Sequence, residues 1–202
     1  LEAAFGQRPV IFTTNGFEHR IWDDLAAPPR AIAGFLTKDE LSLLVQRRTT
    51  RRSLAGLELD HRIVERPYQH RAIRKIAEAF EADNERKALI VMATGAGKTR
   101  TVVALSDLLI RANWAKRVLF LADRRALVRQ AVNAFKEFLP DSSPVNLLTE
   151  RGTEGRVYVA TYPTMLGLLD ERDAEGRARF GPGHFDLVVI DEAHRSVFRK
   201  YR

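Results

Sequence analysis

The sequence predicts an α/β fold: a partial, parallel-sheet domain built around a phosphate-binding loop (P-loop), preceded by a small α+β segment from the end of an N-terminal domain. Three observations support this. Short apolar runs alternate with helical patterns beyond about residue 60, as in parallel sheets covered by helices on both faces. A glycine-rich loop with a lysine follows one of these runs, and an acidic pair ends another. At 202 residues, the chain can hold one such domain and part of a second.

Residues 1–60 are expected to form the α+β segment and a linker. The stretch Arg8–Asp24 predicts two short strands around Asn15-Gly16, a dipeptide that tolerates the positive φ angles of a tight hairpin. The run "AAPPR" then breaks the strand pattern. Thr37 and Glu40 can form a capping box, which predicts a helix over Lys38–Arg48. The basic run "RRTTRRSLAGLE" predicts a linker, either solvated or in contact with a phosphate backbone, so the domain boundary is placed near residue 60.

Residues 61–202 are expected to form the parallel-sheet domain. Pro67 can open a helix whose apolar residues recur at helical spacing. Four buried strands are then predicted, at Ala88–Met92, Val118–Ala122, Val157–Ala160 and Leu187–Asp191. The helices between them are predicted at Lys98–Ala112, at Arg124–Phe138 and in a short segment after Pro163.

The composition bounds the class of protein. Charged residues make up 29% of the chain and hydrophobic residues 45%, which indicates a globular protein, and no apolar run has the length of a membrane span or a signal peptide. No cysteine is present, which excludes disulfides and Cys-ligated metals and fits a reducing, cytoplasmic setting. The net charge of +7 points to a polyanionic partner such as nucleic acid, although a GC-rich genome explains an arginine-rich composition equally well.

The segment Met92–Thr99, "MATGAGKT", matches most of the G-x-x-x-x-G-K-[ST] loop, with methionine in place of the first glycine. Its glycines let successive amides point at one centre, where the start of the following helix adds partial positive charge. Lys98 is expected to reach the β and γ phosphates of ATP, and the Thr99 hydroxyl to ligate Mg²⁺. The expected nucleotide-binding set within and beside the loop is Thr94, Gly95, Ala96, Gly97, Lys98, Thr99 and Arg100.

The segment Phe185–His194, "FDLVVIDEAH", supplies the acidic half of the expected site. Its apolar run ends at Asp191, which a parallel sheet delivers to the carboxyl edge beside the P-loop. Asp191 is expected to hold Mg²⁺, and Glu192 to orient and deprotonate the attacking water. A kinase does not need a carboxylate at the second position, so Glu192 favours hydrolysis.

Together these motifs resemble motifs I and II of the superfamily 2 helicases and translocases, whose motor is a pair of RecA-like lobes. "RPYQHRAI" resembles the segment of that family that reads adenine, which implies nucleotide contacts from Arg66 and Gln69. "VLFLADRRALVRQ" and "VYVATYPTM" resemble motifs Ia and Ib, which implies nucleic-acid contacts from Arg124 and Thr161. The same resemblance gives His194 a role in coupling ATP hydrolysis to movement.

Three further stretches resemble the motor (R) subunit of type I restriction enzymes: "FLADRRALVRQA", "IDEAHRSVFRKYR", and "PVIFTTNGFEHRIWDD" followed by "PPRAIAGFLTKDEL". In that family, the last of these closes the nuclease domain. The resemblance implies an ATP-dependent translocase that moves double-stranded DNA and cuts it far from the recognition site. It also implies methylation and specificity subunits as partners.

The chain lacks parts of that family's pattern. It shows no D…E-x-K nuclease constellation, no threonine-alanine-threonine segment after His194 and no second RecA-like lobe with an arginine finger. We therefore expect an excerpt truncated after the DEAH motif, inactive in hydrolysis on its own. Two alternatives stay open: another superfamily 2 DNA or RNA helicase or repair ATPase, and a nucleotide-binding module without turnover.

Overall fold

The computed structural model describes residues 2–23, 25, 27–151 and 154–193. Their contacts group the chain into two compact units. The first comprises Leu1–Arg51 with Phe180–His184, and the second comprises Arg52–Arg179 with Phe185–Arg202. The assignment of the first unit to the end of a nuclease-type domain stays a prediction.

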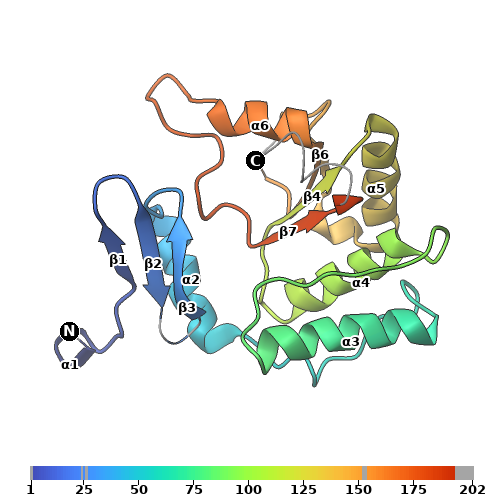
Figure 1. Cartoon of the computed structure of the whole chain (residues 1–202), viewed down its shortest axis with the longest axis horizontal. Coiled ribbons are helices and arrows are strands. Elements are labelled where there is room, and N and C mark those ends of the chain that lie inside the picture. The colour runs from blue at the N-terminus through green and yellow to red at the C-terminus, as the bar shows by residue number, and fades with distance from the viewer. Residues whose placement is uncertain (1, 24, 26, 152–153, 194–202) are drawn as a thin grey trace. The chain divides into compact units, whose positions relative to one another are not determined.

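The described part of the first unit holds a three-stranded antiparallel sheet and two helices, α1 and α2 (Figure 1). Its sheet has the order β1-β2-β3, and the Asn15-Gly16 hairpin is confirmed. Gly16 has a φ of 94°, and the Asn15 side-chain oxygen accepts hydrogen bonds from the amides of Phe17 and Glu18, so the turn satisfies its own backbone. The elements are α1 (Glu2–Phe5), β1 (Ile11–Thr14), β2 (His19–Asp23), β3 (Ala27–Ile32) and α2 (Lys38–Thr50).

Pro28 and Pro29 lie inside β3, where the sequence led us to expect the strand pattern to break. Among the strands that the structure describes, β3 pairs with β2 alone and lies at the edge of the sheet, and their register is irregular between Ile21 and Asp23. The two prolines fall opposite this irregularity. Because proline has no amide hydrogen to donate, an edge strand with an interrupted ladder accommodates it.

Helix α2 begins at the predicted capping box. The Thr37 hydroxyl accepts from the Glu40 amide at 3.3 Å, and the Glu40 carboxylate accepts from the Thr37 amide at 2.8 Å. Later in the helix, the Arg48 guanidinium donates to both carboxylate oxygens of Asp23 and to the carbonyls of Arg8 and Pro9. One buried side chain therefore ties α2 to β2 and to the segment before β1.

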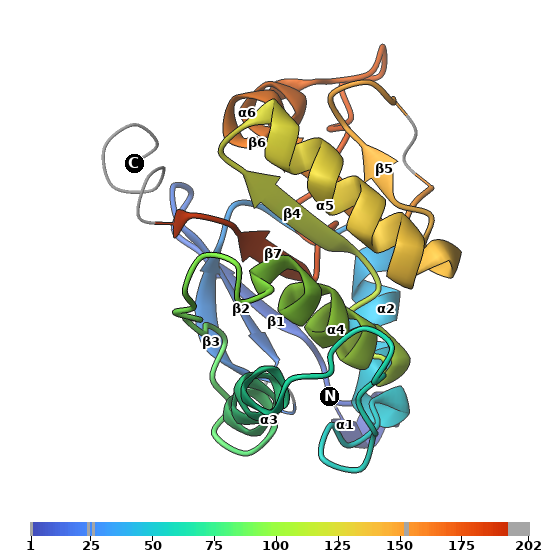
Figure 2. The same cartoon turned by 90° about the vertical axis from the view of Figure 1, so that its right-hand side faces the viewer.

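The second unit contains a parallel sheet with the order β5-β6-β4-β7. Helices α4 and α5 lie along one face of this sheet (Figure 2), and the sheet lies between α5 and α6 (Figure 1). This arrangement is the RecA-like α/β fold that the sequence predicts. The elements are α3 (Pro67–Glu81), α4 (Lys98–Arg111), β4 (Val118–Ala122), α5 (Arg125–Phe138), the 3₁₀ turn Pro140–Ser142, β5 (Val145–Asn146), β6 (Val157–Thr161), α6 (Tyr162–Asp170) and β7 (Leu187–Ile190).

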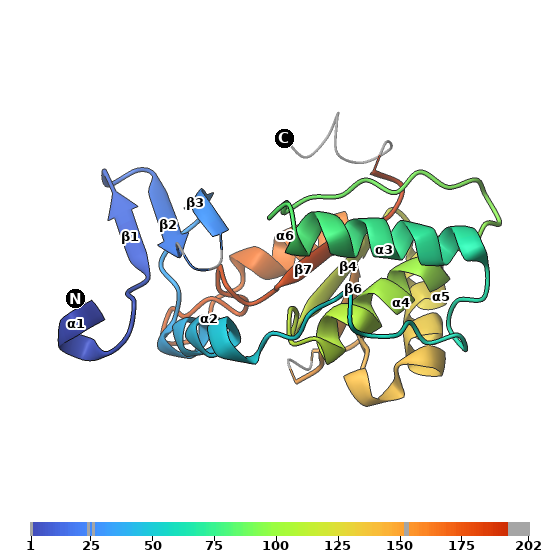
Figure 3. The same cartoon turned by 90° about the horizontal axis from the view of Figure 1, so that it is seen from below.

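The segment expected to be a linker contributes to the core of this unit. Leu54 and Leu59 are buried in the same apolar cluster as α3 and α4, which pack side by side (Figure 3). The Glu81 carboxylate accepts from the Leu54 amide, and the Arg74 guanidinium donates to the Leu54 carbonyl. These bonds fix the segment against α3, so it is an integral part of the unit.

The prediction of a strand at Ala88–Met92 is wrong for this structure. The segment has no strand pairing, and Leu89 and Val91 are 81% and 86% exposed. An apolar run supplies the propensity for a strand, but a strand also needs a neighbour for its backbone hydrogen bonds. No described segment pairs with this one. Among the described residues, β7 likewise has only β4 beside it, and it leaves Val188 and Ile190 half exposed.

Candidate nucleotide-binding site

The P-loop is a glycine turn that leads directly into α4. Gly95 and Gly97 have φ angles of 78° and 83°, and the Ala96 amide donates to the Ala93 carbonyl at 3.2 Å. The Gly97 carbonyl accepts from both the amide and the hydroxyl of Thr101, which locks the first turn of the helix. The free amides at the start of this 14-residue helix favour an anion.

Gly97 lies close to the Gln69 side chain and has a backbone angle that favours glycine. A Cβ at this position would lie 2.6 Å from Nε2 of Gln69, closer than two such atoms approach. Its positive φ already disfavours any side chain. The side chain of Gln69, 28 residues earlier in the sequence, therefore lies directly against the loop at Gly97.

The first turn of α3 is joined to the P-loop by hydrogen bonds. Gln69 is buried, and its Nε2 donates to the carbonyls of Ala96 and Gly97 at 3.3 and 3.4 Å. Its Oε1 accepts from the Arg66 amide at 3.3 Å. The Tyr68 hydroxyl donates to the Ala96 carbonyl at 2.9 Å and accepts from the Arg66 guanidinium at 2.7 Å. The side-chain amide of Gln69, which was expected to bind adenine, thus forms hydrogen bonds with the P-loop in this structure.

The acidic pair stands at the carboxyl end of β7. The Asp191 amide donates to the Leu121 carbonyl at 2.9 Å, which carries the pairing with β4 one residue past the strand. Burial raises the pKa of the Asp191 carboxyl, and the neighbouring Glu192 charge raises it further. Glu192 has a φ of 51°, a conformation that a non-glycine residue rarely adopts outside functional or tightly held sites.

Lys98 and Glu192 form an ion pair that joins the two motifs. The Lys98 Nζ lies 2.9 Å from the Glu192 Oε1, with side chains 35% and 25% exposed. The residues are 94 positions apart in sequence, so the fold brings the P-loop lysine and the acidic pair to one place. An ammonium at this position can exchange a carboxylate for phosphate oxygens, because both are anions of similar hydrogen-bonding geometry.

The other residues expected at the site are placed differently. Thr94 lies exposed in the turn, and Thr99 lies in the first turn of α4. The Arg100 guanidinium stacks on the Phe138 ring, 4.7 Å from its centroid, so its charge is directed toward the end of α5. His194 lies outside the described residues.

The two residues expected to contact nucleic acid differ in accessibility. Arg124 precedes α5, and its side chain is 68% exposed beside Asp123. Thr161 is 7% exposed, and its hydroxyl accepts from the Thr164 amide to cap α6. Arg124 can therefore reach a phosphate directly, whereas the Thr161 side chain already has a role within the fold.

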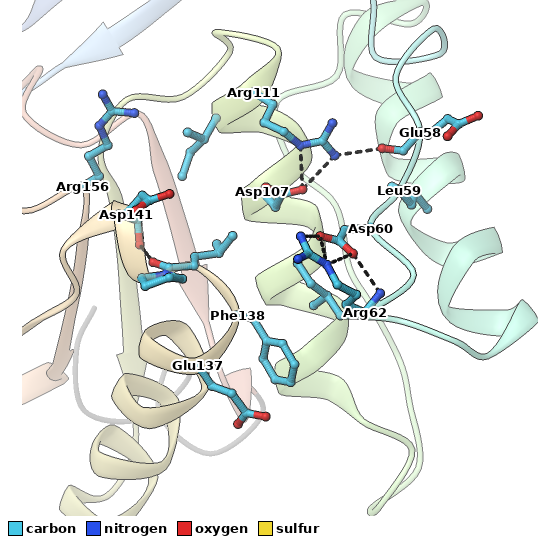
Figure 4. Close-up of a pocket in the computed structure, with 15 residues that line it drawn as sticks. Glu58, Leu59, Asp60, Arg62, Asp107, Arg111, Glu137, Phe138, Asp141 and Arg156 are labelled. Atoms are coloured by element: carbon cyan, nitrogen blue, oxygen red, sulfur yellow. Dashed lines mark hydrogen bonds and ion pairs between the residues drawn. The ribbon is translucent and has the colours of Figure 1, made fainter.

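A cavity of about 940 Å³ lies elsewhere in the second unit (Figure 4). Its walls come from residues 58–63, the C-terminal half of α4, the segment 137–142 and Arg156, and none of the expected site residues lines it. Asp60 and Arg62 form an ion pair in the wall, and this contact lowers the pKa of Asp60 to about 2. Both acidic and basic side chains line this cavity, whereas the P-loop presents backbone amides to a ligand.

Tyr68 and Thr101 belong to the site although the sequence did not reveal them. Tyr68 lies inside the "RPYQ" stretch, so its position beside Gln69 was the available signal. Thr101 lies in the first turn of α4, four residues after Gly97, and its hydroxyl donates a hydrogen bond to the Gly97 carbonyl. Their bonds to loop carbonyls depend on the fold and cannot be read from spacing.

With this geometry in place, comparison with known proteins decides the family. The model of the ResIII family, described as "Type III restriction enzyme, res subunit", matches residues 62–202. The chain belongs to the ResIII family. The match covers the P-loop, the acidic pair and the sheet between them.

The relatives of this ResIII chain include subunits of type I restriction enzymes. The EcoKI endonuclease subunit of Escherichia coli (strain K12) is 34% identical over 138 residues, 64% of this chain and 11% of its own length. The EcoAI endonuclease subunit of Escherichia coli is 37% identical over 132 residues, 64% and 16% of the two chains. The chain thus spans a small part of these relatives. Helicases outside restriction systems also match, at 29% and 30% identity.

A solved structure agrees with these relatives. A fragment assigned to the HsdR subunit of a type I restriction enzyme from Vibrio vulnificus YJ016 is 25% identical, with a TM-score of 0.50. The match covers 96% of this chain and 35% of the other. The family model, the type I relatives and the solved structure agree: this ResIII chain is similar in sequence to type I restriction endonuclease subunits and in fold to an HsdR structure.

Within the described residues, two features of other protein classes are absent. No helix there is both long and apolar enough to cross a membrane. No cluster of three or more His, Asp or Glu side chains there has the arrangement of a metal site.

Proposed function

We propose that this lobe binds ATP with Mg²⁺ and that, in the whole protein, it hydrolyses ATP to translocate double-stranded DNA during type I restriction. The observation that carries the proposal is the 2.9 Å contact between Lys98 and Glu192. It places a phosphate-binding cation and a candidate general base within one hydrogen bond. Such a pair at a glycine turn has the parts that phosphoryl transfer to water requires.

The residues of the lobe have distinct roles in this proposal. Lys98 exchanges Glu192 for the β and γ phosphates, and the amides at the start of α4 bind phosphate oxygens. Glu192, released from the lysine, orients a water and accepts its proton. Thr99 and Asp191 fit Mg²⁺, which prefers such oxygen ligands and neutralises charge on the phosphates. The raised pKa of Asp191 supports this fit, because a buried carboxylate beside a second carboxylate favours a cation.

DNA contact is proposed for the exposed side of the sheet's carboxyl edge. Arg124 offers a guanidinium that is 68% exposed at the end of β4. Contacts of this kind bind the phosphate backbone without reading bases, so affinity should fall steeply with salt. Methylation and specificity subunits are the proposed partners, because the sequence resembles the motor subunit of type I restriction enzymes and the relatives are endonuclease subunits of such enzymes.

A second candidate is a helicase or repair ATPase outside restriction, and the helicase relatives at 29% and 30% identity support it. The two candidates share the nucleotide chemistry. They differ in whether hydrolysis depends on methylation and specificity subunits, because only the restriction motor takes its DNA target from such partners.

The test is ATP hydrolysis by the full-length protein, alone and with duplex DNA, in the presence and absence of those subunits. The restriction proposal expects phosphate release to require both the subunits and DNA. Strong release with any DNA and no partner supports the second candidate. No release under any condition contradicts both.

A further inference from the structure

The Ala96 carbonyl in the P-loop is held by two donors from one neighbouring segment. Tyr68 donates its hydroxyl at 2.9 Å, and Gln69 donates its side-chain amide at 3.3 Å. The Gln69 amide divides its hydrogens between this carbonyl and that of Gly97 at 3.4 Å. The tyrosine contact is therefore the shorter of the two, and among the described residues it is made to this carbonyl alone.

The direction of one peptide bond links this contact to phosphate binding. In a trans peptide, the carbonyl and the following amide hydrogen point in opposite directions. Holding the Ala96 carbonyl toward Tyr68 therefore turns the Gly97 amide the other way, toward the open side of the turn. Gly97 is the N-cap of α4, and its amide has no hydrogen-bond acceptor among the described residues. A free amide at this position is a donor for an anion.

The tyrosine hydroxyl is itself oriented by Arg66. The Arg66 guanidinium donates to the hydroxyl oxygen at 2.7 Å, which leaves the hydroxyl hydrogen to point at the Ala96 carbonyl. The same contact raises the pKa of Arg66. Arg66 thus acts on the loop through Tyr68, in addition to the base contact that its motif implies.

We propose that Tyr68 is a positioning residue for the phosphate-binding loop: its hydroxyl holds the Ala96–Gly97 peptide so that the Gly97 amide faces the polyphosphate. This inference rests on the proposed function, because it presumes that the loop holds ATP. It assigns Tyr68 to the phosphates and not to the base. A triphosphate that carries no base should therefore be affected as strongly as ATP.

Tyr68→Phe removes the hydroxyl and keeps the ring. The ring is 42% exposed, so the substitution leaves no buried cavity. Tyr158→Phe is a control in the same unit, because it removes a tyrosine hydroxyl from buried β6, where the ring packs edge-on against Phe185. Lys98→Ala reports whether the loop is the nucleotide site at all. Thermal unfolding of each full-length variant checks that it is folded.

The measurement is displacement of a fluorescent ATP analogue from the full-length protein by MgATP and, separately, by inorganic tripolyphosphate with Mg²⁺. Tyr68→Phe is expected to weaken both competitors by the same factor, about three- to tenfold, which is the worth of one hydrogen bond. Tyr158→Phe should leave both unchanged. Lys98→Ala should weaken both more strongly than Tyr68→Phe does.

Three results would overturn the inference. If Tyr68→Phe weakens MgATP but not tripolyphosphate, the tyrosine serves the base. If both competitors bind Tyr68→Phe as they bind the wild type, while Lys98→Ala still loses affinity, the loop is the nucleotide site but Tyr68 does not position it. If Lys98→Ala also binds normally, or the wild type binds neither competitor, the proposed function fails and takes this inference with it.

Discussion

Two ion pairs, one in each unit of the chain, show how differently a charge can be used. The Arg48–Asp23 pair in the first unit is 2.9 Å long, and both side chains are more than 90% buried. Arg48 also donates to the carbonyls of Arg8 and Pro9. The Lys98–Glu192 pair in the second unit has the same length, but its side chains are 35% and 25% exposed.

This difference in burial indicates in which pair a ligand can replace one partner. A buried pair with many bonds has lost its water, so removing one partner leaves a charge without compensation. A partly exposed pair is screened by solvent and is held more weakly. The first pair therefore stabilises the fold, whereas the second keeps two reactive groups together until phosphate replaces one of them. The following predictions test this contrast.

Glu192→Gln should have the largest effect on activity. The substitution keeps the shape of the side chain but removes the base, so we expect DNA-stimulated ATP hydrolysis by the full-length protein to fall by about two to four orders of magnitude. Nucleotide binding should survive. Phosphate release and a binding titration on the same sample check both parts, and hydrolysis near the wild-type rate would show that Glu192 is not the base.

Asp23→Asn should cause the largest loss of stability. It leaves the Arg48 guanidinium buried without its counter-charge, and breaking a buried pair in this way costs about 3–5 kcal/mol. Denaturant unfolding of the full-length protein measures the loss. The double variant Asp23→Asn/Arg48→Met should recover part of it, because no buried charge remains. A single variant as stable as the wild type contradicts a structural role for the pair.

Gly97→Ala should weaken nucleotide binding about tenfold or more. The new Cβ would meet Gln69 at 2.6 Å, and the positive φ adds strain of about 1–2 kcal/mol. Gly16→Ala is the matched control, since Gly16 also has a positive φ but no atom within 4 Å of the added Cβ. The control should lose a similar amount of stability and keep its nucleotide affinity. Equal affinities in all three proteins would contradict a coupling between Gln69 and the loop.

Asp60→Asn should have the smallest effect. Asp60 pairs with Arg62, whose side chain is 89% exposed, and such surface pairs contribute little to stability. Because the pKa of Asp60 is lowered to about 2, its stabilisation is complete above the unfolded pKa near 4 and is lost as the pH falls toward 2. Unfolding at pH 7 and near pH 2 tests this. A difference in unfolding free energy between variant and wild type that is larger near pH 2 than at pH 7 would contradict this prediction.

The sequence predicted most of the elements because local signals determine them. The strand Val118–Ala122 was predicted with its observed bounds, since it is apolar throughout and buried on both faces. The capping box of α2 and the start of α4 at Lys98 were also correct, because each depends on residues within one helical turn. The P-loop pattern identified the loop for the same reason.

The remaining features depend on partners that lie far apart in sequence. The apolar run Ala88–Met92 gave no indication that it has no described strand beside it. The bond from Tyr68 to Ala96 joins residues 28 positions apart, and the pair Lys98–Glu192 joins residues 94 apart. Such contacts follow from how the elements pack, which periodicity and propensity do not specify.

The most direct test of the account is a MgATP titration of the full-length protein that compares wild type, Lys98→Ala and Asp23→Asn. If the partly exposed Lys98 binds the nucleotide and the buried pair stabilises the fold, Lys98→Ala should bind MgATP at least about 30-fold more weakly at unchanged stability. Asp23→Asn, measured where it is still folded, should bind as the wild type does. Equal affinity in Lys98→Ala and wild type would contradict the assignment of this loop as the ATP site.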